Sequence, residues 1–352
     1  MQEYKPNPSQ KEAVEYMDGP LIIVAGAGTG KTVVITKKIA YILEKKLATP
    51  EEILALTFTE KAAEEMLTRV DGLINIGYVD LQISTFHSFC QKIIEQFGLD
   101  IGLNHKSKLL NEVDAWLLAR KNFDKFNLDY YRPMGNPASH IHALISHFQK
   151  CKDELITPLE YLNYAENFTA DKDSIEIEDK TRLTEVANAY HTYNQLLLDN
   201  NSLDFADLIF YTIKLLKERP RILKTLQARF KYILIDEFQD VNFAQYQLVQ
   251  MLSGQGQLTV VGDDDQSIYA FRGASVSNIL RFKDDFPQAK EVVLNENYRS
   301  HQEILDTAYK LIQNNNPDRL EFKLKINKKL IAKARTPIQT PKASGMGVEH
   351  IH

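Results

Sequence analysis

The feature that most constrains this sequence is a short glycine-rich loop between an apolar run and an amphipathic stretch. Leu21–Val24 is apolar, and the next eight residues read A-G-A-G-T-G-K-T. Glycines allow a tight turn that points N–H groups at an anion, and a helix beginning after the turn adds its positive end. Lys31 can then reach the β- and γ-phosphates of a nucleotide, and Thr32 can place a hydroxyl on Mg²⁺. We therefore expect a nucleoside triphosphate to bind at Ala25, Gly26, Ala27, Gly28, Thr29, Gly30, Lys31 and Thr32, although Ala25 stands where the pattern usually has glycine.

Composition excludes several other classes of protein. The chain has 352 residues, 44% hydrophobic and 25% charged, which is typical of a soluble protein with two or three domains. A net charge of −5 does not indicate nucleic-acid binding over the whole surface, but a local basic groove would suffice. Two cysteines, Cys90 and Cys151, exclude a four-thiolate cluster and fit a reducing cytoplasm. No signal core or membrane-length apolar run is present, so we expect a cytoplasmic protein without a membrane partner.

Short apolar runs alternate with helical stretches along much of the chain. This order predicts an α/β fold with a parallel sheet flanked by helices. The expected strands are Leu21–Val24, Ile53–Thr57, Gln82–Thr85, Tyr232–Ile235, Leu258–Val261 and Val292–Leu294. The expected helices are Thr32–Leu43, Lys61–Val70, Phe86–Phe97 and Asn242–Leu252.

Residues 101–200 differ from the rest. They are rich in helix formers and aromatics and lack apolar strand patterns, and they separate Lys31 from the next nucleotide element by about 200 residues. We interpret them as an all-helical subdomain inserted into the α/β domain. The acidic stretch Asp171–Asp179 is typical of a solvated loop, and Lys325–His352 is typical of a linker.

A second group of polar residues follows two of the expected strands. Asp236 and Glu237 end the run Tyr232–Ile235, where Asp236 can hold Mg²⁺ and Glu237 can orient and deprotonate a water. Gly262–Ser267 follows another strand, and its three aspartates lack the spacing of a calcium-binding EF-hand. We interpret Gln266 in this segment as a γ-phosphate sensor.

Two further patterns carry less weight alone. Tyr298 and Arg299 offer an aromatic face for a base and a guanidinium for transition-state charge. His140, His142, His147 and Cys151 offer potential metal ligands, but no paired CxxC accompanies them. We interpret these four as ordinary helix-surface residues.

Taken in order, these segments resemble the UvrD/Rep/PcrA family of superfamily 1 DNA helicases. The resemblance extends from Asn7 to Ser300 and is weakest in the insertion. Its motifs are a glutamine motif at Asn7–Val14, motif I at Ala25–Thr32, motif Ia at Leu54–Ala63, motif Ib at Ser84–Phe89, a re-entry segment at Leu203–Leu208, motif II at Ile235–Asp240, motif III at Val261–Ala274 and motif IV at Leu294–Ser300. Motifs V and VI do not follow Ser300, so the chain resembles the amino-terminal portion of such a helicase.

The resemblance implies a RecA-like P-loop NTPase organisation. Residues 1–100 and 201–286 would form the first motor domain, 101–200 the inserted helical subdomain, and 287–352 the start of a second RecA-like domain plus a linker. It also assigns roles to the nucleotide-binding residues. Gln10 would recognise the adenine edge of ATP, and Tyr298 would stack on the adenine. Thr32 and Asp236 would hold Mg²⁺. The catalytic residues would be Lys31, Glu237, Gln266 and Arg299, with Arg299 as an arginine finger.

The implied DNA contacts suit a sequence-blind motor, which needs aromatic faces for bases and polar or cationic groups for phosphates. They are Phe58, Thr59, His87, Tyr269, Phe271 and Arg272. Two residues depart from the family pattern. Val33 stands where an arginine often stacks over adenine, and Phe271 stands where the family usually has tryptophan.

The resemblance implies an ATP-driven 3′-to-5′ single-stranded-DNA translocase and helicase, acting on single strands and single-strand/duplex junctions in repair or replication. One alternative is the helicase subunit of a recombination or defence nuclease, with partner proteins unknown. An alternative of another class is a module that binds ATP and DNA with little turnover.

Overall fold

The computed structural model describes residues 5–74, 81–104, 106–168, 175–254, 256–267 and 276–333. Its centre is a parallel sheet of six strands in the order β3-β2-β6-β7-β1-β8. The strands are β1 Leu21–Ala25, β2 Ile53–Thr57, β3 Gln82–Thr85, β6 Tyr232–Ile235, β7 Gln257–Gly262 and β8 Lys290–Leu294. The predicted α/β fold is confirmed, and each predicted strand is present with its ends moved by at most two residues.

Helices cover both faces of this sheet, which is why its strands are apolar without alternation. Along β1, Ile22 and Val24 face one core, and Leu21 and Ile23 face the other. The first core is packed by α4 Phe86–Phe97, α9 Phe205–Glu218, α10 Pro220–Arg229, α11 Phe243–Ser253 and α12 Val276–Asp285. The second is packed by α1 Pro8–Glu15, α2 Lys31–Glu44 and α3 Glu60–Leu73.

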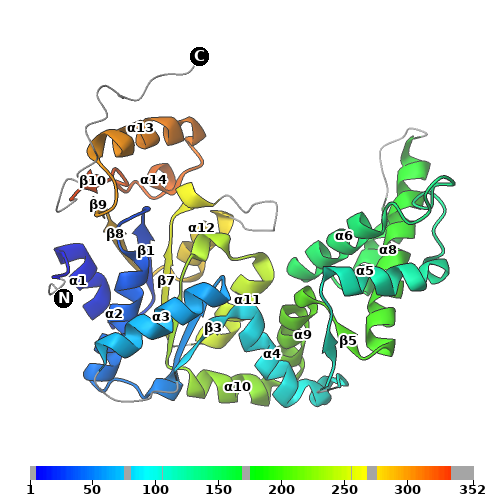
Figure 1. Ribbon diagram of the computed structural model, residues 1–352, viewed down its shortest axis with the longest axis horizontal. Helices are drawn as coiled ribbons and strands as arrows, with labels where there is room; N and C mark the ends of the chain where they lie inside the picture. The colour runs from blue at the N-terminus through cyan, green and yellow to red at the C-terminus, as the bar shows by residue number, and fades with distance from the viewer. Residues whose placement is uncertain are drawn as a thin grey trace, which may run out of the picture.

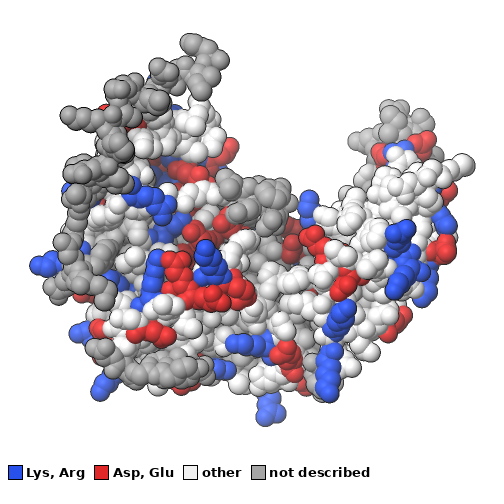
Figure 2. All heavy atoms as spheres, in the orientation of Figure 1, with Lys and Arg blue, Asp and Glu red and all other residues white. Residues whose placement is uncertain are grey.

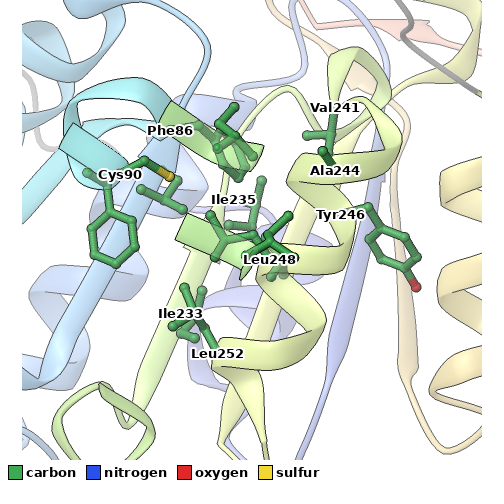
Figure 3. Close-up of a cluster of buried hydrophobic side chains, with 14 of the residues drawn as sticks. Phe86, Cys90, Ile233, Ile235, Val241, Ala244, Tyr246, Leu248 and Leu252 are labelled. Carbon is green, nitrogen blue, oxygen red and sulfur yellow. The ribbon is translucent and has the colours of Figure 1, made fainter. Parts of the chain in front are cut away.

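The first core shows how β6 is fixed. Figure 3 shows Ile233 and Ile235 of β6 clustered with Leu248 and Leu252 of α11 and with Phe86 at the start of α4. The helices α3, α4 and α11 begin at the polar caps Thr59, Thr85 and Asn242, whose side-chain oxygens each accept from an unpaired N–H group of the first turn. All four helices predicted from sequence are present.

The insertion has a hydrophobic core of its own. It contains α5 Glu112–Lys121, α6 Ile141–Asp153, α7 Pro158–Asn167 and α8 Ile175–Asp199, which extend away from the sheet (Figure 1). Phe148 of α6 stacks on Tyr190 of α8, with ring centroids 5.2 Å apart. The chain leaves and returns through two paired two-residue strands, β4 Lys108–Leu109 and β5 Ser202–Leu203, which the sequence pattern does not predict.

A buried ion cluster fixes the base of the insertion. Lys152 Nζ on α6 lies 2.9 Å from Asp204 Oδ2 and 2.7 Å from Asp207 Oδ1, at the start of α9, and all three side chains are buried. The predicted loop at Asp171–Asp179 is wrong for its second half, because Ile175–Asp179 begins α8. Acidic residues near a helix N-terminus are stabilised by the helix dipole, which favours this start. Residues 171–174 lie outside the described part.

The chain after α12 returns to the sheet edge. β8 pairs with β1, and β9 Glu296–Asn297 pairs with β10 Ile331–Ala332. Along the chain, α13 Gln302–Ile312 and α14 Leu320–Lys323 lie between β9 and β10. β8 belongs to the central sheet. The division into domains stays a prediction.

Short 3-10 helices complete the described elements: η1 Pro50–Glu52, η2 Gly98–Ile101, η3 Phe123–Phe126, η4 Phe238–Asp240, η5 Asp264–Gln266 and η7 Gln313–Asn315. None of the helices in the described ranges combines the length and apolar character that crossing a membrane requires.

Candidate nucleotide site and nucleic-acid residues

The glycine-rich loop joins the end of β1 to the start of α2. Gly28 and Gly30 have φ values of +75° and +91°, in the left-handed region that favours glycine. Thr29 Oγ1 donates to the Gly26 carbonyl at 2.7 Å and closes the turn. The loop therefore has the backbone shape that presents N–H groups and a helix N-terminus to an anion.

Three polar side chains converge beside this loop. Lys31 Nζ lies 2.7 Å from Glu237 Oε2 and 3.3 Å from Gln266 Oε1. They meet because β1, β6 and β7 are parallel neighbours, so the loops after these strands leave the same edge of the sheet. Three segments that are far apart in sequence thus form one site.

Asp236 and Thr32 form an oxygen pair next to this group. Thr32 Oγ1 lies 3.4 Å from Asp236 Oδ2. Burial raises the pKa of Asp236 to about 6, and the charge of neighbouring Glu237 adds to the increase. A buried carboxylate beside a hydroxyl is the hard-oxygen donor set that suits Mg²⁺, so these residues fit the ion.

A cavity of about 420 Å³ opens over these side chains. Tyr298 and Arg299 line it together with Lys31. Their segment is fastened to the loop, because Tyr298 N donates to the Gly28 carbonyl at 2.9 Å and Asn297 Nδ2 donates to the Ala27 carbonyl at 2.6 Å. The cavity lies within the size range of small-molecule sites in proteins, which is about 300–1,000 Å³.

The residues predicted to contact DNA have varied surroundings. Thr59 is exposed, and its hydroxyl accepts from Ala62 N at 3.1 Å as the cap of α3. Phe58 is half-buried at the end of β2. His87 lies on α4, and burial lowers its pKa, which keeps the ring neutral at pH 7. Tyr269, Phe271 and Arg272 lie outside the described residues.

Charge on the visible face is mixed. Figure 2 shows Lys and Arg side chains interspersed with Asp and Glu, and acidic side chains gathered near the centre of the view. This agrees with the net charge of −5 and gives no broad basic surface on that face.

The metal site considered in the insertion is not assembled. His147 Nε2 lies 2.9 Å from the Tyr161 hydroxyl, and His142 stacks on Trp116. Among the described residues, Asp263, Asp264 and Asp265 are the only group of three or more potential ligands within reach of one another. The four insertion residues therefore do not form a metal site.

Comparison with known proteins decides the family. The UvrD/REP helicase N-terminal domain family matches residues 6–287. The chain belongs to the UvrD/REP helicase family. It is 42% identical over 310 residues to the ATP-dependent DNA helicase PcrA of Bacillus subtilis, covering 88% of this chain and 39% of that protein. Similar proteins of the same name from Staphylococcus epidermidis and Staphylococcus aureus are 40% and 39% identical over 310 residues, covering 88% of this chain and 40% of each relative. The chain thus spans about two fifths of the length of these relatives, and the predicted family is confirmed.

The UvrD/REP-family resemblance assigns adenine reading to Gln10, and the structure gives this residue a second task. Gln10 is buried, and its Nε2 donates to the Thr29 carbonyl at 2.9 Å. Its Oε1 accepts from Asn7 N at 3.1 Å. Gln10 therefore supports the phosphate loop from behind and does not line the cavity; its contact with adenine stays a prediction. Ala25, Gly26 and Thr29 are likewise not among the residues that line the cavity.

Sequence reasoning did not single out two residues, one that lines the cavity and one that contacts a predicted DNA-binding residue. Arg69 on α3 lines the cavity beside Val33 and pairs with Glu65 one turn away, so it brings a guanidinium to a wall where Val33 has none. Phe205 is 46% exposed, and its ring centroid lies 5.8 Å from that of His87 in an edge-to-face arrangement. An exposed aromatic directly after the cap of α9 was a signal that could have identified Phe205.

Proposed function

We propose that this chain hydrolyses ATP with Mg²⁺ and belongs to a motor that moves 3′-to-5′ along single-stranded DNA and unwinds duplex at junctions. The observation that carries the proposal is the convergence of Lys31, Glu237 and Gln266 at the carboxyl edge of the sheet. Lys31 Nζ lies 2.7 Å from Glu237 Oε2 and 3.3 Å from Gln266 Oε1. Family membership supports the substrate class. We further propose that the motor serves DNA repair or replication.

The chemistry follows from the positions of these groups. The loop N–H groups and Lys31 neutralise phosphate charge, and Glu237 accepts a proton from the attacking water. Gln239 Nε2 donates to Glu237 Oε2 at 2.7 Å and fixes the orientation of this carboxylate. Mg²⁺ would be held by Thr32 and Asp236 and would neutralise charge on the phosphate oxygens. Arg299 faces the same cavity and stabilises the charge that develops in the transition state.

The segments after β2 and β3, which carry two of the predicted DNA-binding residues, are joined by hydrogen bonds. Glu60 accepts from the Thr85 hydroxyl at 2.7 Å and from the Ser88 hydroxyl at 2.6 Å. These bonds join the start of α3 to the start of α4, so Thr59 and His87 belong to one connected surface. We propose that DNA lies against this surface, with Phe205 as an additional stacking face.

The test is ATP turnover with and without oligo(dT), for wild type and Glu237→Gln. We expect DNA-stimulated turnover in wild type and a loss of about 10²- to 10⁴-fold in Glu237→Gln, the contribution typical of a general base. Nucleotide affinity is retained, because the amide still accepts from Lys31. The matched control is Glu64→Gln on exposed α3, which keeps wild-type turnover. Wild-type turnover in Glu237→Gln would remove Glu237 from the reaction.

A second candidate function is a module that binds ATP and DNA with little turnover. Such a module would need only the nucleotide-binding residues that the structure gathers beside Lys31. Nucleotide binding without DNA-stimulated turnover would favour this candidate, and DNA-stimulated turnover would exclude it.

A further inference from the structure

The acidic loop after β7 is neutralised by a lysine from a distant part of the chain. Lys328 Nζ lies 2.7 Å from Asp263 Oδ1 and 2.7 Å from Asp265 Oδ2, and it also contacts Asp264. The Lys328 side chain is only 4% exposed. Burial by itself would lower the pKa of Lys328, but the three carboxylates outweigh burial and raise it. The ammonium therefore occupies the place among the carboxylates that a bound cation would take.

Arg319 adds a second buried cation to the same loop. Its Nε and Nη2 each donate to Asp265 at 2.7 Å in a bidentate pair, and its Nη1 donates to Glu321 Oε2 at 2.8 Å. The backbone N–H of Leu320 donates to Asp264 Oδ2 at 2.8 Å. Buried charges of this kind persist only when they are paired and hydrogen-bonded, so the loop and the segment 319–328 hold each other in place.

Asp263 carries this contact into the nucleotide site. Its Oδ1 faces Lys328, while its Oδ2 accepts from Gln266 Nε2 at 2.6 Å. Gln266 Oε1 in turn accepts from Lys31 at 3.3 Å. A continuous path of polar contacts thus runs from Lys328 through Asp263 and Gln266 to the phosphate-binding lysine.

The same segment touches the phosphate loop directly. A Cβ added to Gly26 would lie 2.9 Å from Leu330 Cδ2, so Leu330 packs closely on that glycine. β10, which follows Leu330, pairs with β9, and both lie beside the end of β1 in Figure 1. The segment therefore contacts both the phosphate loop, through Leu330, and the acidic loop after β7, through Lys328.

We propose that Lys328 and Arg319 are positioning residues for the γ-phosphate sensor. They hold Asp263–Asp265 so that the amide of Gln266 faces the terminal phosphate. Without them the three carboxylates repel one another, the loop moves and Gln266 loses its orientation. This inference rests on the proposed function, in which Gln266 senses that phosphate.

The experiment compares two ligands, because the proposal concerns only the terminal phosphate. Dissociation constants for Mg²⁺–AMPPNP and Mg²⁺–ADP are measured by calorimetry for wild type, Gln266→Ala, Lys328→Gln and Lys329→Ala. We expect Lys328→Gln to lose about tenfold in AMPPNP affinity and to keep ADP affinity within about twofold, as Gln266→Ala does. Lys329→Ala is the matched control, since Lys329 is 53% exposed and pairs with Asp306 on α13. It keeps both affinities.

Asp263→Asn provides a second variant in case Lys328→Gln does not fold. This variant leaves Lys328 paired with Asp264 and Asp265 and removes only the charge of Asp263, the residue that contacts Gln266. We therefore expect the same loss of AMPPNP affinity with ADP affinity retained. Circular dichroism checks that each variant is folded. A folded variant that loses AMPPNP and ADP affinity equally, or that keeps both affinities, overturns the inference. If Gln266→Ala loses the preference for AMPPNP over ADP while Lys328→Gln and Asp263→Asn keep it, the inference is overturned and the role of Gln266 stands. Equal affinities for the two nucleotides in wild type would overturn the role of Gln266 and the inference with it.

Discussion

Asn297 is the residue whose removal tests most sharply how the two sides of the nucleotide site are joined. Its side chain is buried and makes three hydrogen bonds to backbone. Nδ2 donates to the Ala27 carbonyl at 2.6 Å, and Oδ1 accepts from Arg299 N at 2.8 Å and from Ser300 N at 2.7 Å. Asn297→Ala removes all three at once and releases Arg299 from the phosphate loop.

The magnitude follows from these contacts. A buried hydrogen bond contributes about 1 kcal/mol net, and a buried partner left unpaired costs about 1–3 kcal/mol. Water can reach part of the space from the cavity, which lowers the cost. We therefore expect Asn297→Ala to reduce the free energy of unfolding by about 2–4 kcal/mol. We also expect nucleotide affinity to fall by about tenfold, because Arg299 is no longer held at the cavity.

The assay is urea denaturation followed by far-ultraviolet circular dichroism, with nucleotide titration on the folded variant. The one tryptophan, Trp116, lies on α5 in the insertion, so its fluorescence reports that core separately. The control is Asn314→Ala, at an exposed position in η7, which we expect to stay within about 0.5 kcal/mol of wild type. An Asn297→Ala variant with wild-type unfolding and wild-type affinity would refute the reasoning.

Three further predictions concern the ion cluster, the metal ligand and the loop. Lys152→Met leaves two buried carboxylates without their cation, so urea denaturation should show a loss of about 3–5 kcal/mol, whereas exposed Lys150→Met should change little. Because the pKa of Asp236 is raised to about 6, Mg²⁺-dependent nucleotide affinity should fall as pH drops below about 6, and Asp236→Asn should remove that dependence in titrations. The free energy of unfolding depends on pH in the opposite sense. The raised pKa of Asp236 stabilises the fold below pH 3.8, and this contribution is lost as pH rises through about 6. An Asp236 contribution, measured as wild type minus Asp236→Asn, that increases over this pH range would contradict the raised pKa. In Gly28→Ala the new Cβ would lie 2.7 Å from Asn297 Nδ2 at a left-handed φ, so nucleotide affinity measured by calorimetry should fall, while Gly72→Ala on open α3 should bind as wild type does.

The sheet and the phosphate loop could be predicted because their signals are local. Four-residue apolar runs such as Tyr232–Ile235 identify buried parallel strands, and the residues after them necessarily meet at one edge. Asp236, Glu237 and Lys31 were therefore found from spacing and order alone. The residues after the strands also predicted a γ-phosphate sensor at Gln266 and a guanidinium for transition-state charge at Arg299, and the family resemblance assigns both residues the same roles.

The remaining contacts depend on distances that a sequence does not contain. Lys328 lies 63 residues after Asp265, and nothing in its neighbours indicates that it is buried against three carboxylates. Arg69 reaches the cavity only because α3 packs beside α2. Gln10 turned out to hold Thr29, since the cap of α1 fixes its direction. Each of these is set by how elements pack, which local patterns leave open.

The central claim is that Lys31 and its loop hold the phosphates of a nucleoside triphosphate. The most direct measurement is calorimetric titration of Mg²⁺–AMPPNP into wild type, Lys31→Ala and the exposed control Lys45→Ala. We expect binding in wild type and Lys45→Ala and a loss of affinity on the order of 100-fold or more in Lys31→Ala. Equal affinity in wild type and Lys31→Ala would contradict it.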